Sequence, residues 1–445
     1  LALREHASFC ESSNSANYDE AMSSFFRNVD SKENTELPVG NGKGKIRSLK
    51  ARAVLIDMEE GVINEVLRSS LGSLFDTNQI IQDVMGSGSG SGNNWAHGHE
   101  VYGPKYADSI LEQMRRTAED CDSLQSFFLL HSLGGGTGSG LGTYVLELLQ
   151  DSFPEVYRFT TCVFPSEDDD VVTSPYNSVL SLAKLIEHAD CVLPIHNQSL
   201  IDICNKIYEP SQGRGKKLEN QLISEKKSKS KAKAFDDMNT LGAHLLCNLT
   251  CSMRFPGTLN VDLNEITMNL VPFPNLHFLI PSLSPLYTLK AGLAQQPRSI
   301  DHMFSDAFDK DHQLVKLNPM SDTYLACSLM LRGSVQMSDI TRNIERMKPK
   351  LKLAHWNEDC FKIGLCSLPP VGQKFSLLSL ANNCCIKDTF CDIKARFNRL
   401  YKRKAHLHHY TEYVEEGYFQ ESVRQIDSVV SEYSAVQRAK PSTNK

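Results

Sequence analysis

The feature that most constrains this chain is a glycine-rich run, HSLGGGTGSGLGTY, at residues 131–144. It lies between an apolar stretch at 127–130 and a helix-like stretch at 144–149, at a strand-to-helix junction. Six of the nine residues 134–142 are glycine, whereas an ordinary turn needs one or two. Bare backbone at a helix N-terminus lets several N–H groups converge on one anion, and the hydroxyls of Thr137 and Ser139 could donate as well. We therefore predict a phosphate-binding loop, with a flexible turn as the alternative.

Neither of two common nucleotide motifs fits this run. A P-loop requires Gly-Lys-Ser/Thr, which the sequence lacks, and G-x-G-x-x-G fails because Ser139 stands at its sixth position. A second glycine stretch, GSGSGSGNNWAHGH at 86–99, follows another strand-like segment. It reads as a linker by itself, but GNNWAHGH is not linker composition. We expect the two loops to wrap a di- or triphosphate together.

A metal ion is the expected source of positive charge, because no lysine accompanies either glycine loop. Asp57 and Glu59, in the segment DMEEG after a strand-like stretch, offer carboxylates for Mg²⁺ through water. The alternative is that Glu59 is an exposed loop acid.

Strand-like and helix-like segments alternate through the first half of the chain. This alternation predicts an α/β fold with a parallel sheet, whose ligands bind beyond the carboxyl ends of the strands. The expected strands are 52–57, 126–132, 157–165 and 191–195, and the expected helices are 105–121, 141–153 and 175–189.

Four regions are expected along the chain. Residues 1–234 form a Rossmann-like domain with a Lys-rich insertion at about 210–234, which is a solvated loop or a docking site for an acidic partner. Residues 235–255 form a buried central helix. Residues 256–370 form a smaller α/β domain with strands at 276–280, 324–333 and 362–368. Residues 371–445 form a helical region whose main helix covers 390–410.

Composition excludes several classes of function. Of 445 residues, 41% are hydrophobic and 22% charged, and the net charge of −6 gives no general case for nucleic-acid binding. No apolar run approaches eighteen residues, so no membrane span is expected. The thirteen scattered cysteines indicate reduced, buried thiols. The histidines of HLHH (406, 408 and 409) indicate a basic helix end, with a metal site as the weaker alternative.

Beyond the glycine loops, the sequence resembles the tubulin family along nearly its whole length. The matching segments are RAVLIDMEEG, GSGNNWAHGH, HSLGGGTGSGLGT, SPYNSVLSL, NQSLIDIC, RFPGTLNVDLNEI, NLVPFPNLHF, YLACSLMLRG and YKRKAHLHHY. FPEVYRF, MNLVPFP, MFSDAF and RNIERMKP are more similar to the epsilon class than to the alpha, beta or gamma classes. The resemblance implies a GTP-binding domain, a central helix, a smaller α/β domain and C-terminal helices.

The resemblance also implies roles for individual residues in binding GTP or GDP with Mg²⁺. Residues that match the phosphate contacts are Ser132, Gly134, Gly135, Gly136, Thr137, Gly138 and, in the second loop, Asn93. Asn197 and Asn239 match the asparagines that read guanine, and Phe235 stands where the family usually stacks a tyrosine on the base. Glu59, with Asp57 near it, matches the magnesium-associated position.

Three departures from the family pattern stand out. The sequence has no initiator Met or signal-peptide pattern and begins within the expected first helix, without the family's N-terminal strand and its phosphate loop. The acidic residues 167–170 fall in the ribose-contacting loop with uncertain register. The Lys-rich insertion precedes the central helix, near the expected end-to-end contact.

The segment LNVDLNE places Asp262 and Glu265 three residues apart, which suits one face of a helical turn or two solvated acids. In the family this loop reaches the nucleotide of the next subunit, and the alpha class carries Glu at the position of Glu265. We therefore expect Glu265, aided by Asp262, to orient the attacking water on a neighbouring subunit's GTP.

The resemblance implies a cytoplasmic, cytoskeletal protein acting in microtubule organisation at centrioles, centrosomes and basal bodies. Its expected partners are delta-tubulin or alpha- and beta-tubulin, together with centriolar proteins. The alternative is a non-polymerising scaffold, stabilised by nucleotide, that forms a heterodimer with another rare tubulin.

Overall fold

A computed structural model describes residues 1–12, 20–30, 36–37, 46–83, 90–166, 171–208, 227–287 and 299–439. The first half is built on three parallel strands in the order β6-β7-β8. These strands are β6 (Ser126–Ser132), β7 (Tyr157–Phe164) and β8 (Cys191–His196). Two short parallel strands, β4 (Leu55–Ile56) and β5 (Ile80–Ile81), form a separate pair. The predicted parallel α/β architecture is therefore confirmed.

Helices cover both faces of the β6-β7-β8 sheet. On one face, Cys162 of β7 and Val192 of β8 join a core with α5 (Ser174–His188), α12 (Ile386–Tyr401) and α14 (Glu416–Arg438). On the other face, alternate residues of the same strands, such as Phe159 and Leu193, join a core with α6 (Asn197–Tyr208) and α7 (Lys227–Leu249). Burial on both faces favours apolar residues, which explains the continuous hydrophobic run Cys191–Ile195 of β8.

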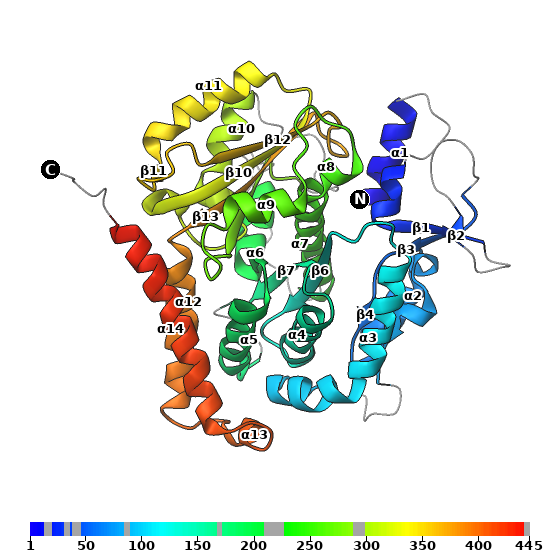
Figure 1. Cartoon of the computed structure of the whole chain (residues 1–445), viewed down its shortest axis with the longest axis vertical. Helices are drawn as coiled ribbons and strands as arrows, with labels where there is room; N and C mark the ends of the chain where they lie inside the picture. Colours follow the sequence, from blue (N-terminus) through cyan, green and yellow to red (C-terminus); the bar gives the residue numbers. More distant parts are fainter. Residues whose placement is uncertain are drawn as a thin grey trace, which may run out of the picture.

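A second sheet continues beyond β8, where Val192 bridges to Phe278. Its strand order is β11-β10-β13-β9, with β12 also paired to β10. Helices α10 (Ile300–Ala307) and α11 (Met337–Met347) cover this sheet in the upper part of Figure 1. The strands are β9 (Leu279–Ser284), β10 (Thr323–Gly333), β11 (Lys352–Leu353), β12 (Phe361–Cys366) and β13 (Phe375–Asn383).

The remaining elements lie at the periphery or between the two sheets (Figure 1). The small antiparallel sheet β2-β1-β3 stands at one side with α1, and α9 lies beside β10. Their bounds are α1 (Ala2–Ser12), β1 (Phe26–Val29), β2 (Glu36–Leu37), β3 (Leu49–Ala51), α2 (Glu60–Arg68), α3 (Gly103–Glu119), α4 (Gly142–Ser152), α8 (Cys251–Arg254), α9 (Leu263–Leu270) and α13 (His408–Thr411).

Several predicted elements need correction. The strand expected at 52–57 is only the two residues of β4, and the helix expected at 235–255 is two helices, α7 and α8, that meet at Thr250. The helix expected at 390–410 ends at Tyr401, and residues 402–407 form turns before α13. Lys404 and His406 have positive φ angles, 48° and 58°, which a helix cannot accommodate.

Candidate nucleotide site

The first glycine loop leaves β6 at Ser132 and enters α4 through a π-helical turn at Thr137–Leu141. Close packing explains why side chains are missing there. A methyl group on Gly136 would lie 2.6 Å from the backbone nitrogen of Asn94. A methyl group on Gly135 would meet nothing closer than Oδ1 of Asn93, at 3.7 Å. Neighbouring backbone thus fills the space beside Gly136, whereas the space beside Gly135 is open, as an anion-binding loop requires.

The second glycine loop packs directly on the first. Of the segment 86–99, residues 90–99 are among the described ones, and Asn93 takes a left-handed conformation with φ 54°. The hydroxyls of Ser91 and Thr137 lie 3.0 Å apart. A methyl group on Gly140 would lie 2.2 Å from the carbonyl oxygen of Trp95, so the two backbones touch. The two loops therefore form one structural unit.

Ser139 does not have the role that its position suggests. It is fully buried, and its hydroxyl donates to the carbonyl oxygen of Gly135 and, at 3.4 Å, to that of Gly136. The prediction that it helps to bind phosphate is wrong, because the π-helical turn points its side chain into the protein. Gly134, Gly138 and Thr137 are half-buried and remain available.

Asn177 of α5 is a residue that sequence reasoning missed. Its side chain is fully buried and contacts both glycine loops. The amide nitrogen donates to the carbonyl oxygens of Asn93 and Gly134, both at 2.8 Å. The amide oxygen accepts from the backbone N–H of Trp95 at 2.9 Å. The available signal was an asparagine within SPYNSVLSL, a helix that is buried along most of its length.

The expected metal ligands follow β4. Glu59 is the residue before α2, and its backbone N–H donates to Asp57 Oδ1 at 3.2 Å. Burial is the largest influence on Asp57 and raises its pKa. A methyl group on Gly90 would lie 3.9 Å from Cβ of Glu59 and 4.0 Å from Oγ1 of Thr137. Two carboxylates at the edge of a phosphate loop fit Mg²⁺, which binds one or two carboxylates together with substrate phosphates.

The residues expected to contact the base lie on α6 and α7. Asn197 is the first residue of α6 and is half-buried. Phe235 and Asn239 lie one helical turn apart on α7; both are exposed, the ring of Phe235 by 56%. An aromatic ring exposed beside polar amides is suited to stacking on a purine. Packing between α6 and α7, through residues such as Ile203 and Met238, fixes this part of the site.

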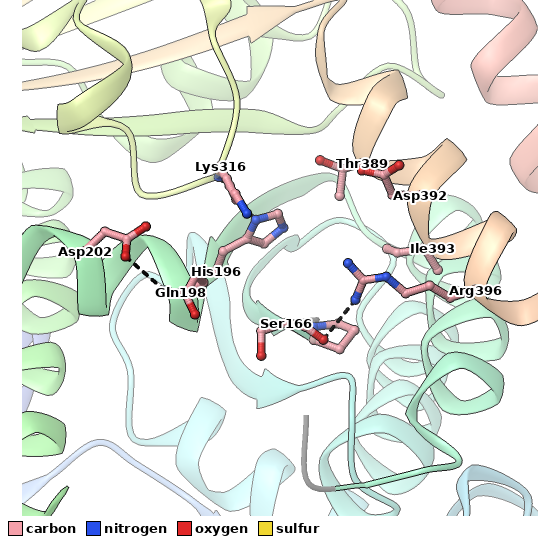
Figure 2. A pocket seen from close by; sticks show the side chains of 10 residues that line it. Ser166, His196, Gln198, Asp202, Lys316, Thr389, Asp392, Ile393 and Arg396 are labelled. Atoms are coloured by element: carbon pink, nitrogen blue, oxygen red, sulfur yellow. Dashed lines mark hydrogen bonds between the residues drawn. The ribbon is translucent and has the colours of Figure 1, made fainter. Parts of the chain in front are cut away.

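A cavity of about 400 Å³ is lined by His196 and Gln198, the two sequence neighbours of Asn197 (Figure 2). His196 ends β8 in its wall, and its Nδ1 accepts a hydrogen bond from the backbone N–H of Lys316 at 3.2 Å. Burial, with the nearby charges of Arg396 and Lys316, lowers the pKa of His196 to about 4. The imidazole beside Asn197 is therefore neutral at physiological pH. Residues 167–170, which follow this wall, lie outside the described residues.

The predicted catalytic acids lie at the start of α9, which packs against β10 of the second sheet, whereas the first glycine loop follows β6 of the first sheet (Figure 1). Asp262 caps α9, because its Oδ1 accepts from the backbone N–H of Glu265 at 2.8 Å. Glu265, in the first turn, pairs with Lys362 of β12 at 3.3 Å. The two acids therefore do not act as an equivalent pair, since one carboxylate caps the helix and the other is held by a lysine.

Comparison with known proteins places this geometry in a family. The GTPase domain of the Tubulin/FtsZ family matches residues 3–205, and the tubulin C-terminal domain matches residues 274–395. The chain belongs to the tubulin family. It is 56% identical to the tubulin epsilon chain of Homo sapiens and 55% to that of Mus musculus, in each case over 99% of this chain and 92% of the relative. It is 36% identical to the tubulin beta-2 chain of Suillus bovinus, over 87% of this chain and 82% of the relative.

The family membership supports guanine-nucleotide binding by this tubulin-family chain and a place in the cytoskeleton. Within the described residues, no helix is long and apolar enough to cross a membrane. The same part of the chain holds no group of three or more His, Cys, Asp or Glu side chains arranged to bind a metal ion. The histidines of HLHH are exposed, and the cysteines whose side chains the structure describes form no disulfides and are mostly buried.

Proposed function

We propose that this chain holds GTP or GDP with its phosphates on the paired glycine loops. Ser132, Gly134–138 and Asn93 surround the phosphates, with Asp57 and Glu59 on the Mg²⁺ side. Asn197 and Asn239 read the guanine edge, on which Phe235 stacks. The observation that carries this proposal is the tight packing of the two loops around an open face at Gly135. When bound, Mg²⁺ would neutralise phosphate charge that no lysine of these loops offsets.

We further propose that GTP hydrolysis requires a second subunit, with Glu265 acting on the neighbour's nucleotide. Glu265 cannot serve this chain's own glycine loops, because α9 packs on β10 of the other sheet. The surface around α9 suits contact with another protein, since Met268, Phe273 and Trp356 are 65%, 41% and 43% exposed. In this proposal a longitudinal partner covers these side chains and draws Glu265 away from Lys362.

GTP turnover by a co-assembly with the longitudinal partner tests this role. Glu265→Ala is expected to lower turnover about a hundredfold or more, because a carboxylate that orients water contributes at least that factor. Glu421→Ala removes an exposed acid paired with Arg424 on α14 and serves as the matched control. Unchanged turnover in Glu265→Ala would sink the role of Glu265 as the acid that acts in trans.

The cellular role that these features support is microtubule organisation at centrioles, centrosomes and basal bodies in the cytoplasm. Delta-tubulin or alpha- and beta-tubulin are the proposed tubulin partners, together with centriolar proteins. We propose 1–234, 235–255, 256–370 and 371–445 as the working domain division, in which β13 of the last region completes the second sheet. Sedimentation with GTP and with GDP distinguishes assembly from the scaffold alternative: nucleotide-dependent oligomers support assembly, whereas a fixed heterodimer contradicts it.

A further inference from the structure

Residues 402–409, from the end of α12 into the first turn of α13, form a basic segment that contacts the second glycine loop. Its exposed side chains are Lys402, Arg403, Lys404, His406, His408 and His409. Two of its carbonyl oxygens are held from the nucleotide domain. The hydroxyl of Tyr176 donates to that of Ala405, and the amide of Asn94 in the second glycine loop donates to that of His409, both at 2.8 Å. A surface segment far away in sequence is thus fastened to the predicted phosphate site.

Tyr410, the next residue, makes the most direct connection. It is fully buried, and its hydroxyl donates to Oδ1 of Asn177 at 2.6 Å. With this bond, Asn177 has two donated and two accepted hydrogen bonds, the full capacity of an amide. One side chain therefore joins the carbonyl groups of both glycine loops to Tyr410, the residue that follows the basic segment. Any rotation of the amide breaks several of these bonds at once.

The backbone of the basic segment needs such external support. Lys404 and His406 have φ angles of 48° and 58°, a left-handed conformation that is disfavoured for residues with a side chain. Such conformations persist where surrounding contacts determine them. The backbone N–H groups of Lys404 and Ala405 donate locally, to the carbonyl oxygens of Tyr401 and Leu400. The contacts from the nucleotide domain are the bonds from Tyr176 and Asn94 and the bond between Asn177 and Tyr410. If the glycine loops shift, the segment loses the bond from Asn94 and, through Asn177, the bond to Tyr410.

We propose that Asn177 is a positioning residue that couples nucleotide binding on the glycine loops to the conformation of the basic segment. The proposal rests on the proposed nucleotide site, and it adds regulation to that site. Nucleotide orders the loops, the ordered loops hold Asn177, and Asn177 holds Tyr410 and the segment before it. Coupling is reciprocal, so a partner that binds the segment changes the affinity for nucleotide by the same factor.

Tyr410→Phe tests the coupling with little damage to the fold. The phenyl ring keeps its packing against Tyr176 and Phe419, whose ring centroids lie 5.2 Å and 6.0 Å away. Only the hydroxyl and its bond to Asn177 are lost. The matched control is Tyr401→Phe, which removes an exposed contact of 3.5 Å to Glu416. If Tyr410→Phe does not fold, Asn94→Ser replaces it, because the short side chain removes the donor to His409 and its hydroxyl can still accept from the backbone N–H of Ala96 without adding charge beside the phosphates.

The measurements are GTP affinity in Mg²⁺ and the rate of trypsin cleavage after Lys402, Arg403 and Lys404, with and without GTP. In the unmodified protein and in Tyr401→Phe, GTP is expected to slow cleavage at least about fivefold, the lower range of typical couplings. In Tyr410→Phe, GTP still binds, up to about tenfold more weakly, but changes cleavage less than about twofold. A purely structural role would instead speed cleavage equally with and without GTP.

The outcomes separate this inference from the proposed function. If the unmodified protein binds no GTP, the nucleotide site is refuted and the coupling with it. If GTP binds but leaves cleavage unchanged, or if it protects Tyr410→Phe as fully as the unmodified protein, the coupling alone is overturned.

Discussion

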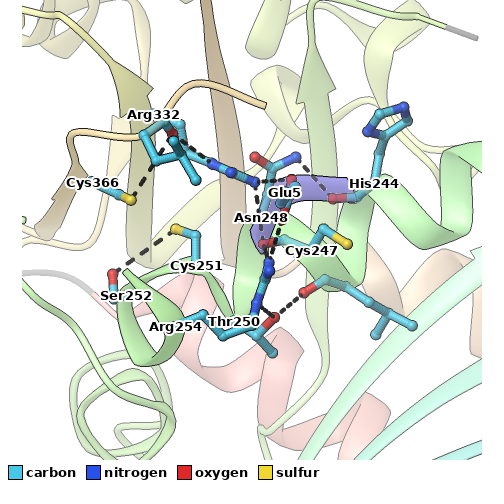
Figure 3. A network of polar contacts seen from close by, with 12 residues as sticks. Glu5, His244, Cys247, Asn248, Thr250, Cys251, Ser252, Arg254, Arg332 and Cys366 are labelled. Atoms are coloured by element: carbon cyan, nitrogen blue, oxygen red, sulfur yellow. Dashed lines mark hydrogen bonds and ion pairs between the residues drawn. The ribbon is translucent and has the colours of Figure 1, made fainter. Parts of the chain in front are cut away.

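The buried ion cluster around Glu5 permits a prediction whose magnitude follows from the structure (Figure 3). Glu5 of α1 is 2% exposed and accepts from Arg254 at 2.6 Å and from Arg332 at 2.7 Å, both of which are fully buried. Glu5→Gln preserves size but leaves two buried guanidinium groups without an anion. Removing one member of a buried ion pair costs about 3–5 kcal/mol. The lost free energy weakens the packing of α1 on the rest of the protein, because Glu5 joins α1 to Arg254 of α8 and Arg332 of β10.

Glu112 provides a matched control on the surface. It also lies between two arginines, Arg115 and Arg116, at 2.9 Å and 2.7 Å, but all three side chains are exposed. Exposed ion pairs contribute about 0.2–1 kcal/mol, because water solvates the separated charges nearly as well. Glu112→Gln should therefore change stability several-fold less than Glu5→Gln, although both remove the same charge.

Hydrogen exchange of the α1 amides is the appropriate assay, because a chain with several domains need not unfold in two states. A loss of about 3 kcal/mol raises exchange in α1 by roughly a hundredfold, since about 1.4 kcal/mol corresponds to tenfold. Glu112→Gln should leave α1 exchange within about threefold of the unmodified protein. Equal effects of the two variants, or a change below fivefold in Glu5→Gln, would refute the reasoning that burial sets the cost.

Two further predictions concern the first glycine loop. Gly140→Ala places a methyl carbon 2.2 Å from the carbonyl oxygen of Trp95 and should lower the melting temperature. Gly135→Ala has 3.7 Å of clearance, so it should keep the melting temperature and weaken GTP binding about tenfold or more. Similar melting temperatures for the two variants would contradict this prediction. Burial lowers the pKa of His131 to about 4. Between about pH 4 and about pH 6.5 the unfolded chain binds a proton at His131 that the folded chain does not bind. The contribution of His131 to the free energy of unfolding is therefore complete above about pH 6.5 and falls by about 1.4 kcal/mol per pH unit between about pH 6.5 and about pH 4. A plot of the urea unfolding midpoint against pH should be less steep for His131→Gln than for the unmodified protein.

Features that depend on near neighbours in sequence were predictable. A strand, a glycine run and an amphipathic helix follow one another within about thirty residues, so the order β6, loop and α4 could be predicted directly. The same holds for α5, which begins with Pro175 near its N-terminus, as the sequence indicates. The glycine run also predicts close approach of two backbones, though not the identity of the second one.

The direction of a side chain within a local motif, and contacts with residues distant in sequence, were not predictable. The role of Ser139 was misjudged, because a local pattern does not tell whether a π-helical turn directs the hydroxyl inward. The catalytic role of Asp262 stays a prediction; the structure adds that its carboxylate caps α9. The break after Tyr401 was missed, because helical spacing continues through a segment whose backbone is fixed by contacts with Tyr176 and Asn94.

Local sequence was enough to place two bare glycine loops after parallel strands in a chain of the tubulin family. The side chains that connect those loops to the rest of the molecule became evident only in the folded structure. Asn177 and Tyr410 are 233 residues apart, and Glu5 and Arg332 are 327 apart. Buried polar groups must find hydrogen-bond partners wherever the fold places them, and sequence spacing carries no record of that choice.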